Sequence, residues 1–238
     1  MRGQLEFRVK HFEGSGSRVI FIFGFGCNLE QPGLRWCLER FMKEELDLTC
    51  IQLPTDITDF QTEVISRCED IQEAAGDNVT LGFSYGGLAL SFLNGSRRRI
   101  FIAPFWEVNE RWMKKGGHAL AAFLSLAHGP GLKRKFYTRD AGPLAVDEDL
   151  EGMPDRISFS SVHQFFQAQK DLPPPKRNDI IFYGSDDIVV STRAMEERIN
   201  RFGLESRRFA GGHIFYLENN REEIIDMILH EVKSSFGG

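Results

Sequence analysis

Short apolar runs alternate with longer amphipathic segments along most of the chain, and this alternation leaves few possible folds. The runs are rich in β-branched and aromatic residues, as are buried strands of a parallel sheet. They lie at 18–23, 48–53, 78–83, 99–103 and 179–183, and the pattern continues with a strand near 205–209. Segments with helical spacing lie at 33–43, 60–75, 85–93 and about 221–233. This order predicts an α/β fold with right-handed crossovers and a mostly parallel, doubly wound sheet.

The alternation lapses between residues 104 and 177. This segment is rich in glycine and proline, which interrupt regular structure, and it contains two predicted helices at 112–128 and 161–170. We expect one domain over 1–238, with a core of 1–103 and 178–238 and a small helical cap insertion at 104–177. A chain of 238 residues with 42% apolar content can bury one substantial core. The alternative for 104–177 is a set of surface helices without a gating role.

Composition excludes several classes of protein. The net charge of −5 indicates no basic surface of the kind that nucleic-acid-binding proteins use to contact phosphates. The four cysteines form no C-x-x-C pair, so the sequence predicts no metal site and favours free thiols in a reducing cytoplasm. The first residues lack a signal-peptide layout, and no apolar run approaches the roughly 18 residues of a membrane span. We therefore expect a cytoplasmic protein without a membrane span; nothing in the sequence indicates an oligomeric state.

The most specific motif is G-x-S-x-G at residues 82–86, between an apolar run and a helical run. A serine on a tight strand-to-helix turn has strained backbone angles, and glycines beside it prevent collisions with neighbouring backbone. Such a turn exposes the hydroxyl of Ser84 above the sheet edge. Backbone N–H groups at the start of the following helix can face negative charge that develops on a substrate oxygen. Ser84 is therefore the predicted nucleophile.

An acid and a histidine follow the serine in the chain order that this chemistry uses. Asp187 comes after an apolar strand in Gly184-Ser-Asp-Asp, and Asp186 is the competing carboxylate. Adjacent side chains at a strand end point in opposite directions, so we expect only one to reach inward. His213 lies between the last strand and the last helix, where it can take the Ser84 proton and return it to the leaving group. The other five histidines are expected to be ordinary polar residues.

These motifs make the chain similar to the α/β-hydrolases over residues 1–103 and 178–238. The family places its acid three residues after a glycine, which favours Asp187. The segment 20–28 resembles the family's oxyanion loop, with Phe23 in place of a histidine. The resemblance implies two oxyanion donors, the backbone N–H groups of Phe25 and Tyr85, and no metal or organic cofactor.

A serine nucleophile argues against the dehalogenase and epoxide-hydrolase branches of this fold, which need a carboxylate at the turn. The sequence therefore predicts a serine esterase that cleaves carboxylic esters through an acyl-enzyme on Ser84. Aromatic residues beside the motif loops predict an apolar acyl pocket for a small-molecule ester. The candidates are Phe25, Phe83, Phe105 and Trp106, and the alternative for each is a place in the core.

Three alternatives stay open at this point. A thioesterase or peptidase would use the same three residues. The short length, the loop at 23–28 and the small cap also resemble esterases that remove a methyl group from pimeloyl on acyl carrier protein. Basic residues at 114–115, 133–135 and 139 would suit an acidic carrier, although such residues are more often a solvated helix face. The third alternative is a non-catalytic binding module with a hydrolase fold.

Overall fold

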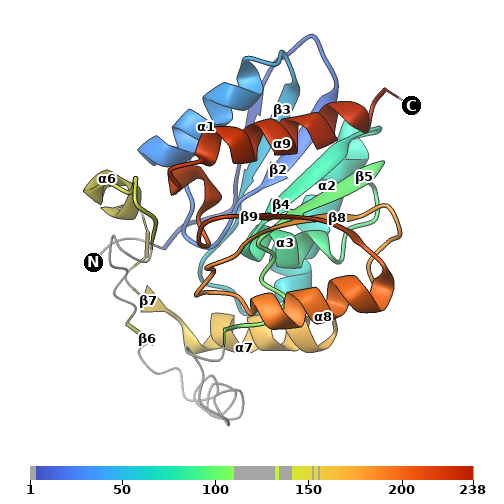
Figure 1. The fold of residues 1–238 in the computed structure, drawn as a ribbon. Helices are drawn as coiled ribbons and strands as arrows, with labels where there is room; N and C mark the ends of the chain where they lie inside the picture. Colours follow the sequence, from blue (N-terminus) through green and yellow to red (C-terminus); the bar gives the residue numbers. More distant parts are fainter. Residues whose placement is uncertain (1–3, 110–131, 134–140, 152, 155, 238) are drawn as a thin grey trace.

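A computed structural model describes residues 4–109, 132–133, 141–151, 153–154 and 156–237. Its main feature is a sheet of seven described strands in the order β1-β3-β2-β4-β5-β8-β9 (Figure 1). All neighbours pair in parallel except β1, which runs antiparallel to β3 at one edge. A separate antiparallel pair joins β6 to β7. The strands are β1 (Arg8–Phe12), β2 (Arg18–Ile22), β3 (Asp47–Gln52), β4 (Val79–Phe83), β5 (Arg98–Ile102), β6 (Leu132–Lys133), β7 (Arg156–Ile157), β8 (Ile180–Gly184) and β9 (Glu205–Phe209).

Helices cover both faces of the sheet, as a doubly wound fold requires. One face packs against α1 and α9, and the other packs against α2, α3, α7 and α8 (Figure 1). Side chains alternate between the two layers, so Phe21 faces α1 whereas its neighbour Ile20 faces the opposite layer. The helical elements are α1 (Pro32–Met42), η1 (Gln61–Ile65), α2 (Ser66–Ala75), α3 (Tyr85–Leu90), α6 (Asp147–Glu151), α7 (Phe159–Lys170), α8 (Thr192–Phe202), η3 (Phe215–Leu217) and α9 (Arg221–Ser234).

The structure confirms the predicted fold class and locates elements that the sequence pattern did not indicate. Each predicted strand is present to within one residue at either end. The edge strand β1 was not predicted, because most of its side chains are exposed and it lacks a buried apolar run. The helix expected over 60–75 begins as the π-helical turn η1 before it continues as α2. No helix in the described ranges is long and apolar enough to cross a bilayer.

The inserted segment is described in part. The helix expected over 161–170 is α7, and the short helix α6 was not predicted. The helix expected over 112–128 and the basic residues 114–115, 134–135 and 139 lie outside the described residues. The division of the chain into a core and a cap stays a prediction.

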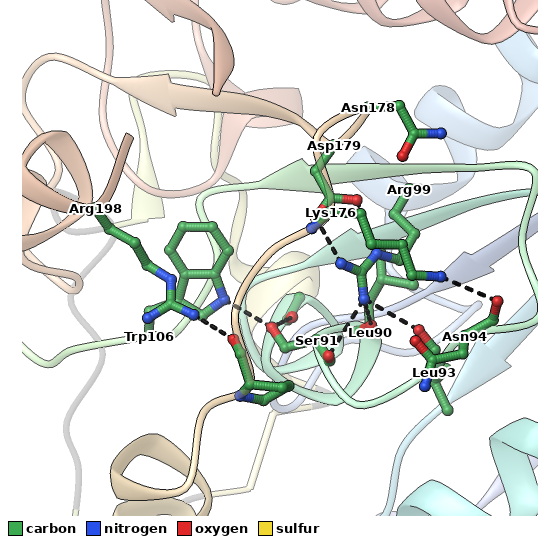
Figure 2. A network of polar contacts seen from close by, with 12 residues as sticks. Leu90, Ser91, Leu93, Asn94, Arg99, Trp106, Lys176, Asn178, Asp179 and Arg198 are labelled. Carbon is green, nitrogen blue, oxygen red and sulfur yellow. Dashed lines mark hydrogen bonds and ion pairs between the residues drawn. The ribbon is translucent and has the colours of Figure 1, made fainter. Parts of the chain in front are cut away.

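A buried ion pair holds the edge of the sheet at which the strands begin (Figure 2). Arg99 and Asp179 are 2% and 0% exposed, and the guanidinium donates from Nε and Nη2 to both carboxylate oxygens at 2.8 and 2.5 Å. The Nη1 group of Arg99 also donates to the carbonyl of Leu90, the last residue of α3, and to the carbonyls of Ser91 and Leu93 just after it. A cation at a helix C-terminus stabilises the helix by complementing its dipole. One side chain therefore joins β5, β8 and α3.

We predict that Asp179→Ala destabilises the protein by about 3–5 kcal/mol, because it leaves the Arg99 cation buried without a counter-charge. Denaturant unfolding followed by circular dichroism measures the change. Asp77→Ala is the control, since Asp77 pairs with Arg97 at the surface and is 62% exposed. Removal of an exposed pair costs less than about 1 kcal/mol. Equal losses in the two variants would contradict the importance of the buried pair.

Candidate active site

Ser84 occupies the turn between β4 and α3 with a strained backbone. Its φ of 51° and ψ of −112° lie outside the regions that non-glycine residues normally adopt. The glycines around it permit this turn by close backbone contact. A Cβ on Gly82 would lie 2.6 Å from the carbonyl oxygen of Gly86, and a Cβ on Gly86 would overlap the carbonyl of Ile22 in β2. The turn therefore presses α3 onto the sheet and holds the Ser84 side chain at the carboxyl edge.

His213 approaches Ser84 from the segment between β9 and η3. The Ser84 hydroxyl lies 2.8 Å from His213 Nε2, and both residues are only 6% exposed. The Phe83 ring packs against the imidazole with centroids 5.4 Å apart. Gly212 N–H donates to Glu218 Oε1 at 2.8 Å, which fixes the residue just before His213. These contacts hold the imidazole at the serine.

Asp187 completes a continuous hydrogen-bonded chain. Its Oδ2 lies 2.8 Å from His213 Nδ1, and its Oδ1 accepts from the backbone N–H groups of Val189 and Val190 at 2.8 and 3.0 Å. Asp186 points outward, is exposed, and accepts from the hydroxyl of Ser185. The structure thus brings together the three residues singled out in the sequence and separates the competing carboxylate from His213.

Residues 24–28 follow β2, pack against Ser84 and belong to the segment predicted to be the oxyanion loop, so we use that name for them below. A Cβ on Gly24 would approach Ser84 Cβ to 3.2 Å. Phe25 in this loop and Tyr85 at the first turn of α3 line the same cavity as the Ser84 hydroxyl. The amide of Tyr85 is at the helix N-terminus, where no intrahelical acceptor exists. Both predicted donor residues therefore lie beside the serine.

A narrow, mainly apolar cavity of about 70 Å³ opens onto Ser84 and His213. Phe25, Phe83 and Phe105 line it as predicted from the sequence. Its other described walls include residues from several segments: Gly24, Cys27, Tyr85, Met153, Ile157, Phe165, Val189 and Ile214. Met153, Ile157 and Phe165 come from the inserted segment, and only the helical spacing around Phe165 signalled any of them. Sequence position does not show which side chains of an insertion face the serine.

Trp106 lies outside the described lining of this cavity. Its indole N–H donates to Ser91 Oγ at 2.8 Å, and its ring packs against Phe101. The guanidinium of Arg198 lies 5.2 Å from the ring centroid (Figure 2). The structure places Trp106 in the core beneath α3, which corresponds to the alternative considered for it. Phe105 and Trp106 are adjacent, and their side chains point in different directions: Phe105 lines the cavity, whereas Trp106 packs in the core.

Two ionisable side chains in the cavity wall stay neutral. Burial raises the pKa of the Cys27 thiol to about 11, and the thiol lies 3.4 Å from the Tyr216 hydroxyl. Burial also holds the pKa of the Tyr85 phenol well above its usual range. A protonated thiol is a weak nucleophile, so Cys27 acts as an apolar wall. No three His, Cys, Asp or Glu side chains in the described ranges are grouped to bind a metal ion.

No family model and no curated protein sequence matches this chain. Several solved structures, by contrast, align with it over nearly its whole length. A monoacylglycerol lipase from Paleococcus ferrophilus aligns with a TM-score of 0.79 and 16% identity, over 97% of this chain and 100% of its own. A carboxylesterase structure from Nitrososphaera gargenis aligns with a TM-score of 0.67 and 14% identity, over 98% of both chains. An esterase from Exiguobacterium antarcticum gives a TM-score of 0.66 and 16% identity, over 95% of both chains.

These likenesses, together with the sheet order, show that the chain has the α/β-hydrolase fold. The resemblance seen in the motifs is thereby confirmed at the level of the fold.

We predict that Gly86→Ala destabilises the protein by about 3 kcal/mol, because the added methyl group would overlap the backbone carbonyl of Ile22. The overlap cannot be relieved by rotating a side chain, so β2 and α3 must separate. Thermal and denaturant unfolding of the variant measure the loss. A variant as stable as the wild type would contradict the close packing described for the turn.

Proposed function

We propose that this chain is a serine hydrolase that cleaves carboxylic esters through an acyl-enzyme on Ser84. The observation that carries the proposal is the hydrogen-bonded chain from Ser84 through His213 to Asp187, at the mouth of an apolar cavity. Nucleophile, base and orienting acid within hydrogen-bond reach are the geometric signature of nucleophilic acyl transfer.

In the first half-reaction the Ser84 hydroxyl attacks the ester carbonyl. Asp187 accepts a hydrogen bond from Nδ1–H of His213, and this tautomer leaves Nε2 free to take the hydroxyl proton. The imidazolium then gives that proton to the alkoxy oxygen as the ester bond breaks and the alcohol departs. The two backbone bonds to Asp187 Oδ1 keep its carboxylate in place during the transfer.

The carbonyl oxygen becomes an oxyanion when Ser84 attacks. We propose that the N–H groups of Phe25 and Tyr85 stabilise this charge, since both residues border the cavity at the serine. A donor of this kind is worth about 3 kcal/mol of barrier by analogy with other hydrolases. The dipole of the short helix α3, with its N-terminus at Ser84, favours the same charge.

Water completes the cycle. It attacks the acyl-enzyme carbonyl, gives its proton to His213 Nε2, and forms the acid while His213 returns the proton to the Ser84 oxygen. The overall reaction consumes one water and releases an alcohol and an acid. Every step uses residues of this chain and no external oxidant or reductant.

The cavity supports an ester with an uncharged group beside the carbonyl. The described lining contains no Asp, Glu, Lys or Arg, and most of its residues are aromatic or aliphatic. The three solved structures above are described as a lipase and two esterases, which agrees with an ester substrate. We also propose a reducing, cytoplasmic location, because all four cysteines are free and buried.

We predict that the wild type hydrolyses p-nitrophenyl esters and that Ser84→Ala lowers kcat by about 10⁶-fold, by analogy with serine deletion in another hydrolase. A series from acetate to laurate measures the acyl preference, and circular dichroism verifies that the variant is folded. Activity retained in Ser84→Ala would disprove the mechanism.

Assays with acyl-thioesters and with a fluorophosphonate, which labels an activated serine, separate the alternatives. Faster turnover of acyl-thioesters would identify a thioesterase. Reaction of Ser84 with a fluorophosphonate, without turnover of any small ester, would favour a dedicated acyl carrier protein substrate. A protein that neither reacts with the fluorophosphonate nor turns over any ester would be the non-catalytic module.

Two adjacent carboxylates provide a separate test of the mechanism. Asp187→Asn should lower kcat by about 10⁴-fold, because an amide facing Nδ1 favours the wrong imidazole tautomer. Asp186→Asn is the matched control and should change kcat by less than about threefold, since Asp186 is exposed and does not contact His213. Ester kinetics on both variants provide the measurement. The reverse ranking would show that the acid is misassigned.

A further inference from the structure

The oxyanion loop is a tight turn with a buried polar anchor. Cys27 N–H donates to the carbonyl of Gly24 at 3.2 Å, and Gly26 has a φ of 76°, which favours glycine. The turn holds Phe25 at its tip, beside the cavity. A turn of this kind fixes its own shape, but its orientation over Ser84 must come from contacts with the rest of the protein.

Gln31, the residue before α1, makes such contacts with the oxyanion loop through its side chain. Its carboxamide donates from Nε2 to the carbonyl of Gly26 at 3.2 Å, and its Oε1 accepts from Asn28 N–H at 3.2 Å. The residue is 3% exposed. One side chain therefore bonds an acceptor and a donor of the same loop, which restrains the loop against both translation and rotation.

The same amide also joins the loop to the inserted segment. Gln31 Nε2 donates to the backbone carbonyl of Asp149 in α6 at 2.8 Å. The Asp149 carboxylate in turn accepts from Gly33 N–H at 2.7 Å, so it satisfies an amide in the first turn of α1. Just after α6, Met153 and Pro154 lie against Gly26, with Pro154 Cδ only 3.1 Å from where a Cβ would be. The loop is thus clamped between α1 and the insertion.

We propose that Gln31 is a positioning residue, which holds the oxyanion loop so that Phe25 N–H is directed at the oxyanion during acyl transfer. This inference rests on the proposed function. Gln31 does not line the described part of the cavity, so it acts through the loop. Preorganised donors stabilise a transition state only while their geometry is fixed, and a misplacement of about 1 Å can cost about 100-fold in rate.

Loss of the amide should affect kcat more than KM. Leucine has a similar size but leaves the carbonyls of Gly26 and Asp149 and the N–H of Asn28 unpaired in a buried place. We expect the loop to shift toward new partners, which moves the amide of Phe25. The ester in its ground state binds mainly through apolar contacts, whereas the oxyanion forms only in the transition state. An interaction made only in the transition state lowers kcat when it is lost.

The experiment compares Gln31→Leu with Gln72→Leu. Gln72 is also a buried amide, at 2% exposure, with bonds to Thr80, Ser96 and Gly95 on α3's side of the sheet. Both variants lose a buried polar network, and only the first lies at the oxyanion loop. The measurements are kcat and KM for the best p-nitrophenyl ester, the rate of Ser84 phosphonylation by a fluorophosphonate, and thermal unfolding.

We expect Gln31→Leu to lower kcat and the phosphonylation rate by about 10- to 100-fold, with KM changed less than about threefold. Gln72→Leu should lower the unfolding temperature and leave kcat within about twofold. A folded Gln31→Leu protein with wild-type kcat would overturn the inference, and so would an equal kcat loss in both variants. A wild type without Ser84-dependent turnover or phosphonylation would overturn the proposed function itself.

Gln31→Glu keeps the test decisive if Gln31→Leu does not fold. Glutamate preserves the side-chain length and can accept from Asn28 N–H, but its carboxylate cannot donate to the carbonyls of Gly26 and Asp149. A loss of kcat of the same order with KM preserved supports the role of the two donated bonds. Full activity in this variant would show that the loop does not depend on them.

Discussion

Close contact between the backbones of α3 and the sheet sets the position of everything else in the site. Gly82, Gly86 and Gly87 have no side chains to keep the helix away, so the chain turns sharply after β4. The strain falls on Ser84, whose φ of 51° is held by the surrounding hydrogen bonds. His213 and Asp187 only have to reach a point that the turn has already fixed.

The sequence predicted the parts that depend on local pattern. Strands buried on both faces, such as β2 and β8, appear as continuous apolar runs. The glycines around Ser84 and the chain order of Asp187 and His213 also follow from short-range rules. The exposed edge strand β1 was not predicted from this pattern, because pairing with β3 stabilises it without a buried apolar run.

The remainder of the site depends on tertiary placement. Phe105 and Trp106 are adjacent and similar in type, yet one lines the cavity and the other donates to Ser91. Met153 belongs to no motif, and it lines the cavity because Met153 and Pro154 pack against Gly26 of the oxyanion loop. Glu218 and Gln31 act through side-chain hydrogen bonds to backbone groups, and no sequence pattern shows which backbone group a buried amide or carboxylate will contact.

Hydrogen bonds at the two ends of the segment 104–177 attach it to the sheet and to α3, and this has a consequence for how the cavity wall can vary. At the entry, Phe105 N–H donates to the carbonyl of Ser84. At the exit, Lys176 donates from its backbone N–H to the Asp179 carboxylate and from Nζ to the carbonyl of Asn94 (Figure 2). Both ends are therefore tied to the frame around α3. Because Met153, Ile157 and Phe165 lie between these anchors and line the cavity, we expect substitutions at these three residues to alter the cavity wall while the two join points stay in place.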